Sequence, residues 1–232
     1  MTVKISCIIP AYNEEARIGH VLDSVVGHPL VDEVIVVDDG SSDGTADVVE
    51  GREGVTFIKM ERNRGKTWAV TEGIEAAKGS HLLLVDADLL GLEAWHLTAL
   101  ISPIVYNQAD VSISLRKNAP KIWHRIGIDY ISGERVIERE VLASKISELR
   151  KLPKFGLEVF MNRLLMDRDA RIAVVQWPEV VSPFKNAKVG WMRGLTADVK
   201  MITDMCRSVP PWGLASQIYK MRRQRVNVPD QA

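Results

Sequence analysis

The first half of the chain alternates short apolar runs with segments of helical periodicity, and this alternation limits the fold more than any other feature. The apolar runs predict strands at residues 3–9, 31–39, 55–60, 81–87 and 110–116. Apolar residues three and four positions apart predict helices between the first four of these strands, and Gly51 and Gly79 end two of the helices. Strands that alternate with helices form right-handed crossovers. The sequence therefore predicts an α/β fold with a mainly parallel sheet.

Polar loops follow four of the predicted strands, at the point where each strand ends. Their sequences are PAYNEE (10–15), DDGSSDGT (38–45), ERNRGKT (61–67) and DAD (86–88). Ligands of parallel sheets bind beyond the carboxyl ends of the strands, so these loops are expected to meet in one site. Solvated turns would explain any single loop, but they explain four consecutive loops less simply.

Asp86 and Asp88 are the candidate metal ligands in the fourth loop. One alanine separates them, so an extended backbone puts both carboxylates on the same face. Carboxylate oxygens suit Mg²⁺ or Mn²⁺, and two carboxylates leave coordination positions open for water and phosphate oxygens. A solvated turn is the alternative, because D-x-D occurs often by chance.

Asp39 and Lys66 are the candidate ligand contacts in the second and third loops. Asp39 ends a buried run, where a fixed carboxylate can accept a hydrogen bond from an imide N–H or a ribose hydroxyl. Lys66 begins a predicted helix, where its ammonium group could meet a base carbonyl or a phosphate. Turn formation and helix capping are the alternative for Ser41, Ser42 and Asp43, and a solvated surface position is the alternative for Lys66.

Other folds that use carboxylates at strand ends fit this order poorly. A receiver domain places its acidic pair after the first strand, and a haloacid-dehalogenase-type phosphatase places D-x-D there. In this chain the pair follows the second strand and D-x-D follows the fourth. The sequence also contains neither G-x-x-x-x-G-K-[ST] nor G-x-G-x-x-G.

Four ordered motifs, CIIPAYNEE, VVDDGSSDGT, NRGKTWAV and LLLVDADL, resemble the nucleotide-sugar-binding half of family 2 glycosyltransferases. The resemblance covers residues 3 to 116 and extends more loosely to about residue 190. It implies a GT-A fold, a Rossmann-like mixed sheet flanked by helices, here with a helical C-terminal extension. It also implies a UDP-sugar donor and Mg²⁺ or Mn²⁺ as cofactor.

The same resemblance assigns roles to individual residues. Asp39 would accept from the uracil imide, and Lys66 would lie close to the base or the phosphates. Asp86 would face the ribose and the metal, and Asp88 would ligate the metal and so take part in catalysis. The first loop would pack along the base and the ribose through Pro10, Ala11, Tyr12 and Glu14.

The second half of the chain is expected to bind the acceptor. Its pattern predicts helices at 132–152, 154–169 and 190–208 and a strand at 171–177. SGERVIEREVL and KFGLEVFMN resemble the acceptor region of polyprenyl-phosphate glycosyltransferases and of glucosyl-3-phosphoglycerate synthase-like enzymes. Glu158 lies at the apolar start of its helix and is the candidate general base. The alternative is a structural carboxylate bonded to the backbone or to an arginine such as Arg135.

Two departures from the family pattern concern the acceptor and the metal. Glucosyl-3-phosphoglycerate synthase-like enzymes place a metal-binding histidine in the stretch that here reads VVSPFKNAKVG (180–190), which contains none. Lys185 or Lys188 could contact the diphosphate instead, or Asp88 and water could be the only metal ligands besides the nucleotide. Phosphoglycerate becomes a weaker candidate acceptor. The Q-x-x-R-W motif of processive synthases is also missing, which favours a single transfer.

Composition and the C-terminal segment bear on localisation and partners. The 30 Lys and Arg residues balance 30 Asp and Glu residues, so the overall charge indicates no nucleic-acid partner. No apolar run approaches the ~20 residues that span a bilayer, and two cysteines suggest no disulfide framework, so a cytoplasmic protein is expected. The basic segment WGLASQIYKMRRQRV could form a helix with Leu214, Ile218 and Met221 near one face. This helix could lie on the anionic inner face of a membrane, remain solvated, or form a homodimer contact.

These observations predict a metal-dependent glycosyltransferase that moves a hexosyl group from a UDP-sugar to a lipid phosphate or a small phosphorylated molecule. Residues 1–116 would form the nucleotide-sugar-binding half and residues 117–208 the acceptor half of one domain, followed by a basic tail at 209–232. The alternative is a nucleotide-sugar-binding or regulatory protein without transferase activity.

Overall fold

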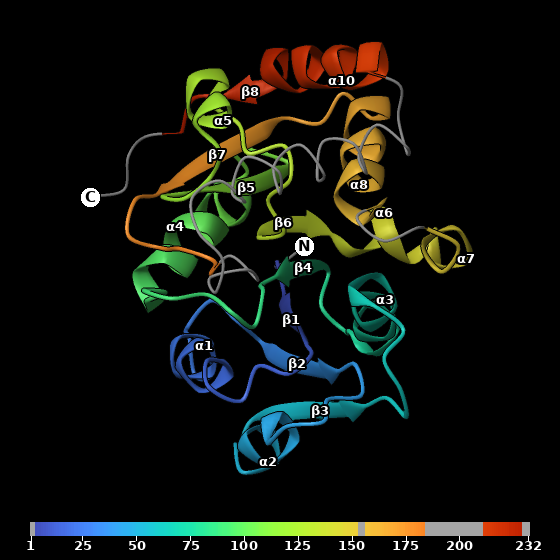
Figure 1. Ribbon diagram of the computed structural model, residues 1–232. Coiled ribbons are helices and arrows are strands. Elements are labelled where there is room, and N and C mark those ends of the chain that lie inside the picture. Colours follow the sequence, from blue (N-terminus) through green and yellow to red (C-terminus); the bar gives the residue numbers. More distant parts are fainter. Residues whose placement is uncertain (1–2, 153–155, 184–210, 229–232) are drawn as a thin grey trace, which may run out of the picture.

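The computed structural model describes residues 3–152, 156–183 and 211–228, which build one mixed sheet with helices on both faces (Figure 1). Within these residues the sheet has eight strands in the order β3-β2-β1-β4-β6-β5-β7-β8. Their bounds are β1 Ile5–Ala11, β2 Glu33–Asp38, β3 Val55–Lys59, β4 His81–Leu84, β5 Val111–Arg116, β6 Arg135–Glu138, β7 Ile172–Trp177 and β8 Arg225–Val226. The predicted mixed, mainly parallel sheet flanked by helices is confirmed.

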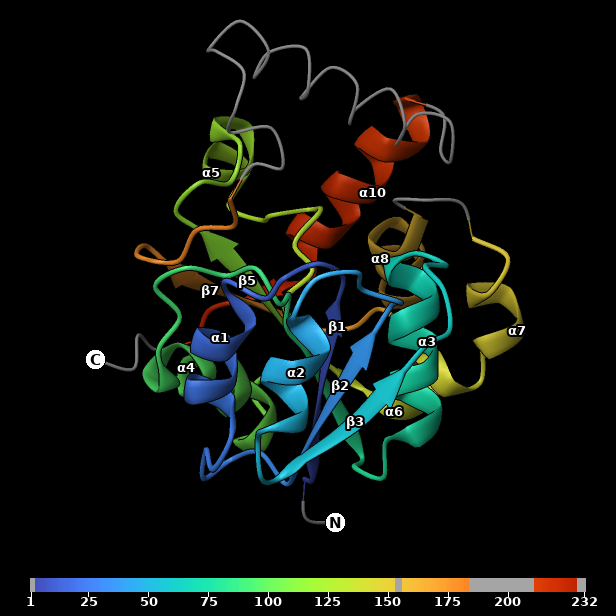
Figure 2. The same cartoon turned by 60° about the horizontal axis from the view of Figure 1, so that its bottom comes forward.

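Neighbouring strands run parallel except at β6. The pairs β1·β2, β1·β4, β2·β3, β5·β7 and β7·β8 are parallel, whereas β6 pairs antiparallel with both β4 and β5. Because β6 is antiparallel to both of its neighbours, β5 runs in the same direction as β4. The carboxyl ends of β1 to β5 therefore lie along one edge, the edge toward which the arrows of β1 and β2 point in Figure 2.

The helices divide between the two faces of the sheet. One face carries α1 Ile18–Val25, α2 Thr45–Glu50 and α4 Ala94–Val105, and the other carries α3 Lys66–Ala76, α6 Arg139–Ala143, α8 Gly156–Asp167 and α10 Pro211–Arg223. Two short helices, α5 Lys121–Ile126 and α7 Ile146–Leu149, lie in connections. Side chains alternate along each strand, so in β2 Val36 packs on the face that carries α1, α2 and α4, and Ile35 packs on the opposite face.

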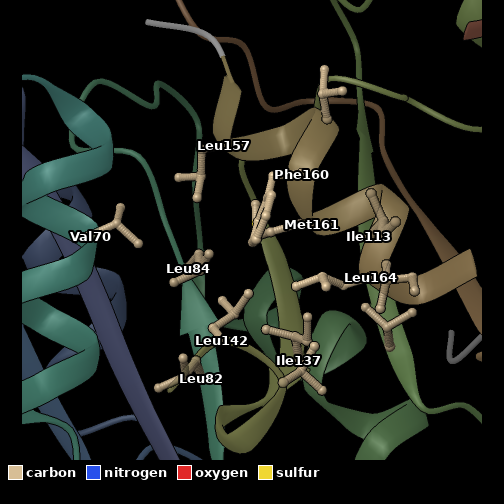
Figure 3. Packing of buried hydrophobic residues seen from close by; sticks show 14 of the residues in the cluster. Val70, Leu82, Leu84, Ile113, Ile137, Leu142, Leu157, Phe160, Met161 and Leu164 are labelled. Carbon is tan, nitrogen blue, oxygen red and sulfur yellow. The ribbon is translucent and has the colours of Figure 1, made fainter. Parts of the chain in front are cut away.

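Packing against the second face fixes the position of α8. Leu84 of β4, Ile137 of β6 and Phe160 of α8 belong to the same buried cluster (Figure 3). Burying an apolar side chain of this size contributes about 1.5–3 kcal/mol, so the contact holds the helix firmly against the sheet. The first turn of α8, which carries Glu158, is thereby held in place.

The helix predicted over residues 132–152 is wrong. The segment instead forms the strand β6 and the two short helices α6 and α7. The segment becomes a central strand because β4 and β5 both hydrogen-bond to it. Its consecutive residues Val136 and Ile137 are accordingly buried on opposite faces of the sheet. The helix predicted at 190–208 lies outside the described residues.

The C-terminal segment forms the predicted helix, but its apolar face points inward. Met221 is fully buried, and Leu214 and Ile218 pack against the same cluster as α8. The face on which membrane contact was predicted is therefore occupied by the protein's own core. Within the described ranges, no helix combines the length and the apolar character needed to cross a bilayer.

Candidate functional site

Asn13 joins the first and second polar loops. It follows β1 with a positive φ of 56°, a conformation that asparagine tolerates better than most residues. Its Oδ1 accepts a hydrogen bond from the Ser42 N–H at 2.8 Å, and its own N–H donates to Ser41 Oγ at 2.9 Å. The Glu14 N–H also donates to Thr45 Oγ1 at 2.8 Å. Asn13 was not among the predicted site residues, although an asparagine directly after a buried strand is a signal for this role.

Asp39 joins the second loop to the third. Its carboxylate is buried and accepts from two backbone N–H groups, those of Arg64 and Gly65, each at 2.7 Å. Gly40 has a positive φ of 70°, and a Cβ there would lie 2.6 Å from the carbonyl carbon of Arg62. Only glycine allows the two loops to approach this closely.

Lys66 connects the third loop, the fourth loop and α8. Its Nζ lies 2.7 Å from Asp86 Oδ1 and 3.3 Å from Glu158 Oε1. Burial acts to lower the pKa of Lys66, but the carboxylates of Asp86 and Glu158 outweigh it and raise this pKa above its ordinary value. A Cβ on Gly133 would lie only 2.7 Å from Lys66 Nζ, so the absence of a side chain there leaves room for the ammonium group.

Asp88 lies beside two other carboxylates and is held by Ser182. The Ser182 hydroxyl lies 3.2 Å from both carboxylate oxygens of Asp88. Asn118 fixes Ser182, because its Nδ2 donates to the Ser182 carbonyl at 2.6 Å and its Oδ1 accepts from the Ser182 N–H at 3.3 Å. Burial, the charge of Asp86 and the charge of Glu14 raise the pKa of Asp88 to about 6, against a smaller lowering by Ser182. Neither Ser182 nor Asn118 was among the predicted site residues.

The surroundings of Asp86 and Asp88 fit a hard divalent cation. The ionised form of Asp88 is disfavoured by burial and by neighbouring negative charge, and a bound cation would relieve both effects. Among the described residues, no group of three or more His, Cys, Asp or Glu side chains could form a closed metal cage. Asp86 and Asp88 would supply carboxylate oxygens, and Mg²⁺ or Mn²⁺ typically keeps water or phosphate oxygens in its remaining positions. Lys185 and Lys188 lie outside the described residues.

A buried charge network lies under the same edge. Arg116, at the end of β5, forms ion pairs with Glu134 at 3.4 Å and with Asp129 at 3.6 Å. Arg135 is fully buried and donates to Asn162 Oδ1 at 3.1 Å. The predicted alternative partner of Glu158 was an arginine such as Arg135, but the ion pair of Glu158 is with the lysine described above.

The residues predicted in the first loop differ in how they face solvent. Tyr12 is 45% exposed, and Pro10 is half-buried. The Ala11 side chain is buried in the core, so a contact of this residue with a ligand would be made by its backbone. Glu14 forms an ion pair with Arg17 at 2.5 Å. Tyr12 is thus the side chain of this loop that is most available for a ligand.

Comparison with known proteins agrees with this architecture. The family model described as "Glycosyl transferase family 2" matches residues 6–175. Over 177 residues the chain is 28% identical to a dolichyl-phosphate beta-glucosyltransferase of Dictyostelium discoideum, covering 70% of this chain and 49% of that protein. Over 126 residues it is 32% identical to a dodecaprenyl-phosphate galacturonate synthase of Rhizobium johnstonii, covering 50% of this chain and 37% of that protein. The chain thus spans half or less of the length of these curated relatives.

Solved structures share the fold. Glucosyl-3-phosphoglycerate synthase of Mycobacterium tuberculosis, crystallised with Mn²⁺, UDP and glucosyl-3-phosphoglycerate, superimposes with a TM-score of 0.70. The match covers 89% of this chain and 80% of that one, at 24% sequence identity. A crystal of the same enzyme with Mg²⁺ and UDP gives the same TM-score. At this identity the likeness establishes the common fold.

Proposed function

Because the chain belongs to glycosyl transferase family 2, we propose that it transfers a hexosyl group from a UDP-sugar to a prenyl phosphate with the help of Mg²⁺ or Mn²⁺. The observation that carries this proposal is the pair Asp86 and Asp88, at the edge where the other polar loops meet and beside the ammonium group of Lys66. The acceptor class is supported by the relatives, which are named for dolichyl and dodecaprenyl phosphate. The donor and the metal are supported by the UDP, Mn²⁺ and Mg²⁺ in crystals of the structural neighbour.

The nucleotide would lie over the joined loops of residues 1–116, with residues 117–208 forming the acceptor side. Tyr12 and Pro10 would contact the base and the ribose, whereas Ala11 would contribute only through its backbone. Asp39 holds the third loop and would accept from the uracil imide with its remaining lone pairs. The Asp86 carboxylate would face both the ribose and the metal.

Departure of UDP places negative charge on its terminal phosphate. Lys66 is a protonated amine at this edge, and its positive charge can stabilise that phosphate when a donor is bound. A divalent cation held by Asp86 and Asp88 would neutralise charge on the leaving group. The Asn118 side chain holds the backbone of Ser182, and the Ser182 hydroxyl in turn holds the Asp88 carboxylate. This contact would keep Asp88 oriented toward the metal.

The acceptor chemistry determines what Glu158 does. A phosphate acceptor attacks the anomeric carbon through an ionised oxygen, so a C–O bond forms while the bond to UDP breaks and its electron pair leaves with UDP. No proton has to be removed in this step. We therefore assign Glu158 the role of holding Lys66, with which it is paired, in place of the predicted general base. A hydroxyl acceptor would instead require a base at this position.

A transfer assay with the purified full chain tests this proposal. The chain is incubated with Mn²⁺, radiolabelled UDP-glucose or UDP-galacturonate, and either a short prenyl phosphate or 3-phosphoglycerate. We expect label in the organic phase with prenyl phosphate. Glu158→Gln should retain activity to within about tenfold, since a general base typically contributes 10²–10⁴-fold.

Other outcomes of this assay identify which part of the proposal fails. Transfer only to 3-phosphoglycerate, with a loss of a hundredfold or more in Glu158→Gln, would overturn the acceptor and restore Glu158 as base. If UDP with Mn²⁺ raises the melting temperature but no label reaches either acceptor, the chain is a nucleotide-sugar-binding protein without transferase activity.

Gly133→Ala is expected to weaken nucleotide binding without unfolding the protein. The added methyl group would lie 2.7 Å from Lys66 Nζ and 3.1 Å from both carboxylate oxygens of Asp86. The end of a half-exposed lysine side chain can move aside, so the fold should survive while the Lys66–Asp86 pair is displaced. Titration calorimetry with UDP and Mn²⁺ should show affinity reduced by roughly tenfold.

Gly19→Ala is the matched control. A Cβ at Gly19 would meet its nearest neighbours at 3.8 Å, an ordinary contact distance, and the residue lies in α1 away from the lysine. This variant should bind UDP as the parent does. Equal affinity in both variants would show that the space at Gly133 does not matter for binding.

A further inference from the structure

Positive charge is concentrated in two segments of a chain whose overall charge is balanced. Residues 117–128 and 211–228 together contain seven of the 30 Lys and Arg residues and none of the 30 Asp and Glu residues. The first segment includes α5 and the second includes α10 and β8. A charge distribution this uneven produces a local positive potential that the net charge of zero conceals.

In α10 the basic side chains lie on the face opposite the core. Leu214, Ile218 and Met221 recur at helical spacing and pack inward. The exposed side of the last two turns carries Tyr219, which is 63% exposed, together with Lys220, Arg222 and Arg223. Within the described ranges, none of these three basic side chains forms an ion pair. All three side chains are exposed, so their charge faces the surface of the molecule.

In α5 the same division of faces recurs. Trp123 is buried against Tyr130, with ring centroids 6.0 Å apart. Ile122 is 58% exposed, and Lys121 and Arg125 flank it on the solvent side. An exposed isoleucine in the same helix as two exposed cations suits an anionic surface with an apolar interior.

The two basic helices adjoin each other. The Tyr130 hydroxyl, just beyond α5, hydrogen-bonds to Gln217 of α10. The guanidinium of Arg225 lies directly against Gly127 at the end of α5. Both helices lie on the side of the molecule toward which β1 and β2 point (Figure 2). They thus form one surface, called here the α5–α10 surface, defined by Lys121, Ile122, Arg125, Tyr219, Lys220, Arg222 and Arg223.

The α5–α10 surface is also connected to the candidate site. Asn118, which holds Ser182 beside Asp88, lies three residues before the first residue of α5. A partner that binds α5 would therefore lie close to the position where an acceptor must approach Asp88.

We propose that the α5–α10 surface docks the protein on an anionic lipid bilayer, with the basic side chains at the headgroups and Ile122 and Tyr219 entering the interface. The inference deepens the proposed function and rests on it for its purpose, because a prenyl phosphate is itself anchored in a membrane. Tyrosine favours the level of the headgroups, and an exposed isoleucine can enter the apolar interior of a bilayer, which favours a bilayer over RNA. Docking uses the outer faces of both helices and leaves the buried face of α10 in the core.

Vesicle flotation of the full chain tests the proposal. We expect the protein to float with mixed phosphatidylglycerol–phosphatidylcholine vesicles, to stay in solution with pure phosphatidylcholine, and to be released by high salt. Neutralising two charges on either helix, as Lys121→Gln/Arg125→Gln or Arg222→Gln/Arg223→Gln, should weaken binding about thirtyfold, since each basic residue contributes about fivefold.

Lys4→Gln/Lys78→Gln is the control, because it removes the same charge from exposed lysines just before β1 and β4, at the opposite edge of the sheet. Equal loss of flotation in all three double variants would overturn the proposal, since it would mean that only net charge matters. Binding to single-stranded RNA without flotation would also overturn it and would indicate a nucleic-acid partner. Transfer of labelled sugar to a short prenyl phosphate by protein that does not float would leave the proposed function intact while removing the docking surface.

Discussion

Asp88→Asn is expected to abolish sugar transfer while making the ligand-free protein more stable at neutral pH. The substitution keeps the shape of the side chain but removes the charge proposed to bind the metal, so turnover should fall by at least about a hundredfold. It also removes a carboxylate that lies close to those of Asp86 and Glu14 in a half-buried position. Loss of that repulsion should stabilise the ligand-free protein by about 1–2 kcal/mol, allowing for solvent screening.

The pH dependence gives the sign of the stability effect. The pKa of Asp88 is raised from its ordinary value of 3.8 to about 6, so the folded protein holds this proton more tightly than the unfolded chain. Below about pH 4 the carboxyl group is protonated in both states and imposes no cost. Between about pH 4 and 6 the unfolded chain ionises first, so the cost appears as the pH rises and is complete above pH 6.

Thermal unfolding of the metal-free proteins measures this difference. The variant should melt about 3 °C or more above the parent at pH 7.5, and the difference should shrink toward zero near pH 4. Asp47→Asn, an exposed acid in the first turn of α2, is the control and should show no such pH-dependent gain. A variant that is destabilised at neutral pH, or that keeps full turnover with Mn²⁺, would contradict the role given to Asp88.

Asp39→Ala is expected to have the largest effect on stability among the site residues. Its carboxylate is the acceptor for the backbone N–H groups of Arg64 and Gly65, and its loss leaves both groups without their charged acceptor. Hydrogen bonds to charged groups contribute about 1.5–3 kcal/mol each, so the loss of both should lower the free energy of unfolding by about 3–6 kcal/mol. The third loop would then lose the position that brings Lys66 to the site.

Urea unfolding and calorimetry together test this expectation. Asp39→Ala should lower the urea midpoint and eliminate measurable UDP binding, because the loop and the proposed uracil contact are lost together. Asp47→Ala removes an exposed carboxylate seven residues beyond Gly40 and should change the free energy of unfolding by no more than about 0.5 kcal/mol. Unchanged stability in Asp39→Ala would mean that its hydrogen bonds are not what holds the third loop. A preference for GDP over UDP in the parent would contradict the uracil contact.

Much of the fold could be predicted from local patterns in the sequence. Branched apolar runs and helical spacing are short-range signals, so the strands that became β1 to β5 and β7 could be placed from them. β6 could not be placed in this way. Arg135, Val136 and Ile137 form a strand because two strands distant in sequence supply its hydrogen bonds, and that demand overrides the helical preference of the residues around it.

The candidate site shows the same division. The sequence by itself determined which residues end the parallel strands, because Asp86 directly follows an apolar run, and Asp39 and Asp88 come within three residues of one. Only the tertiary structure decided which groups those carboxylates meet. Asp39 faces backbone N–H groups of a later loop, Lys66 reaches a helix 92 residues away, and Ser182 reaches Asp88 across 94 residues.

The C-terminal helix shows why the sequence alone could not decide which groups meet in space. Its amphipathic pattern could be read from the sequence, but periodicity does not specify what covers the apolar face. The structure packs Met221 against the core and turns Arg222 and Arg223 outward, so the charged face is the one left for a partner. Local propensity and spacing depend on neighbours along the chain, whereas burial, ion pairing and pKa depend on neighbours in space, which only the completed fold brings together.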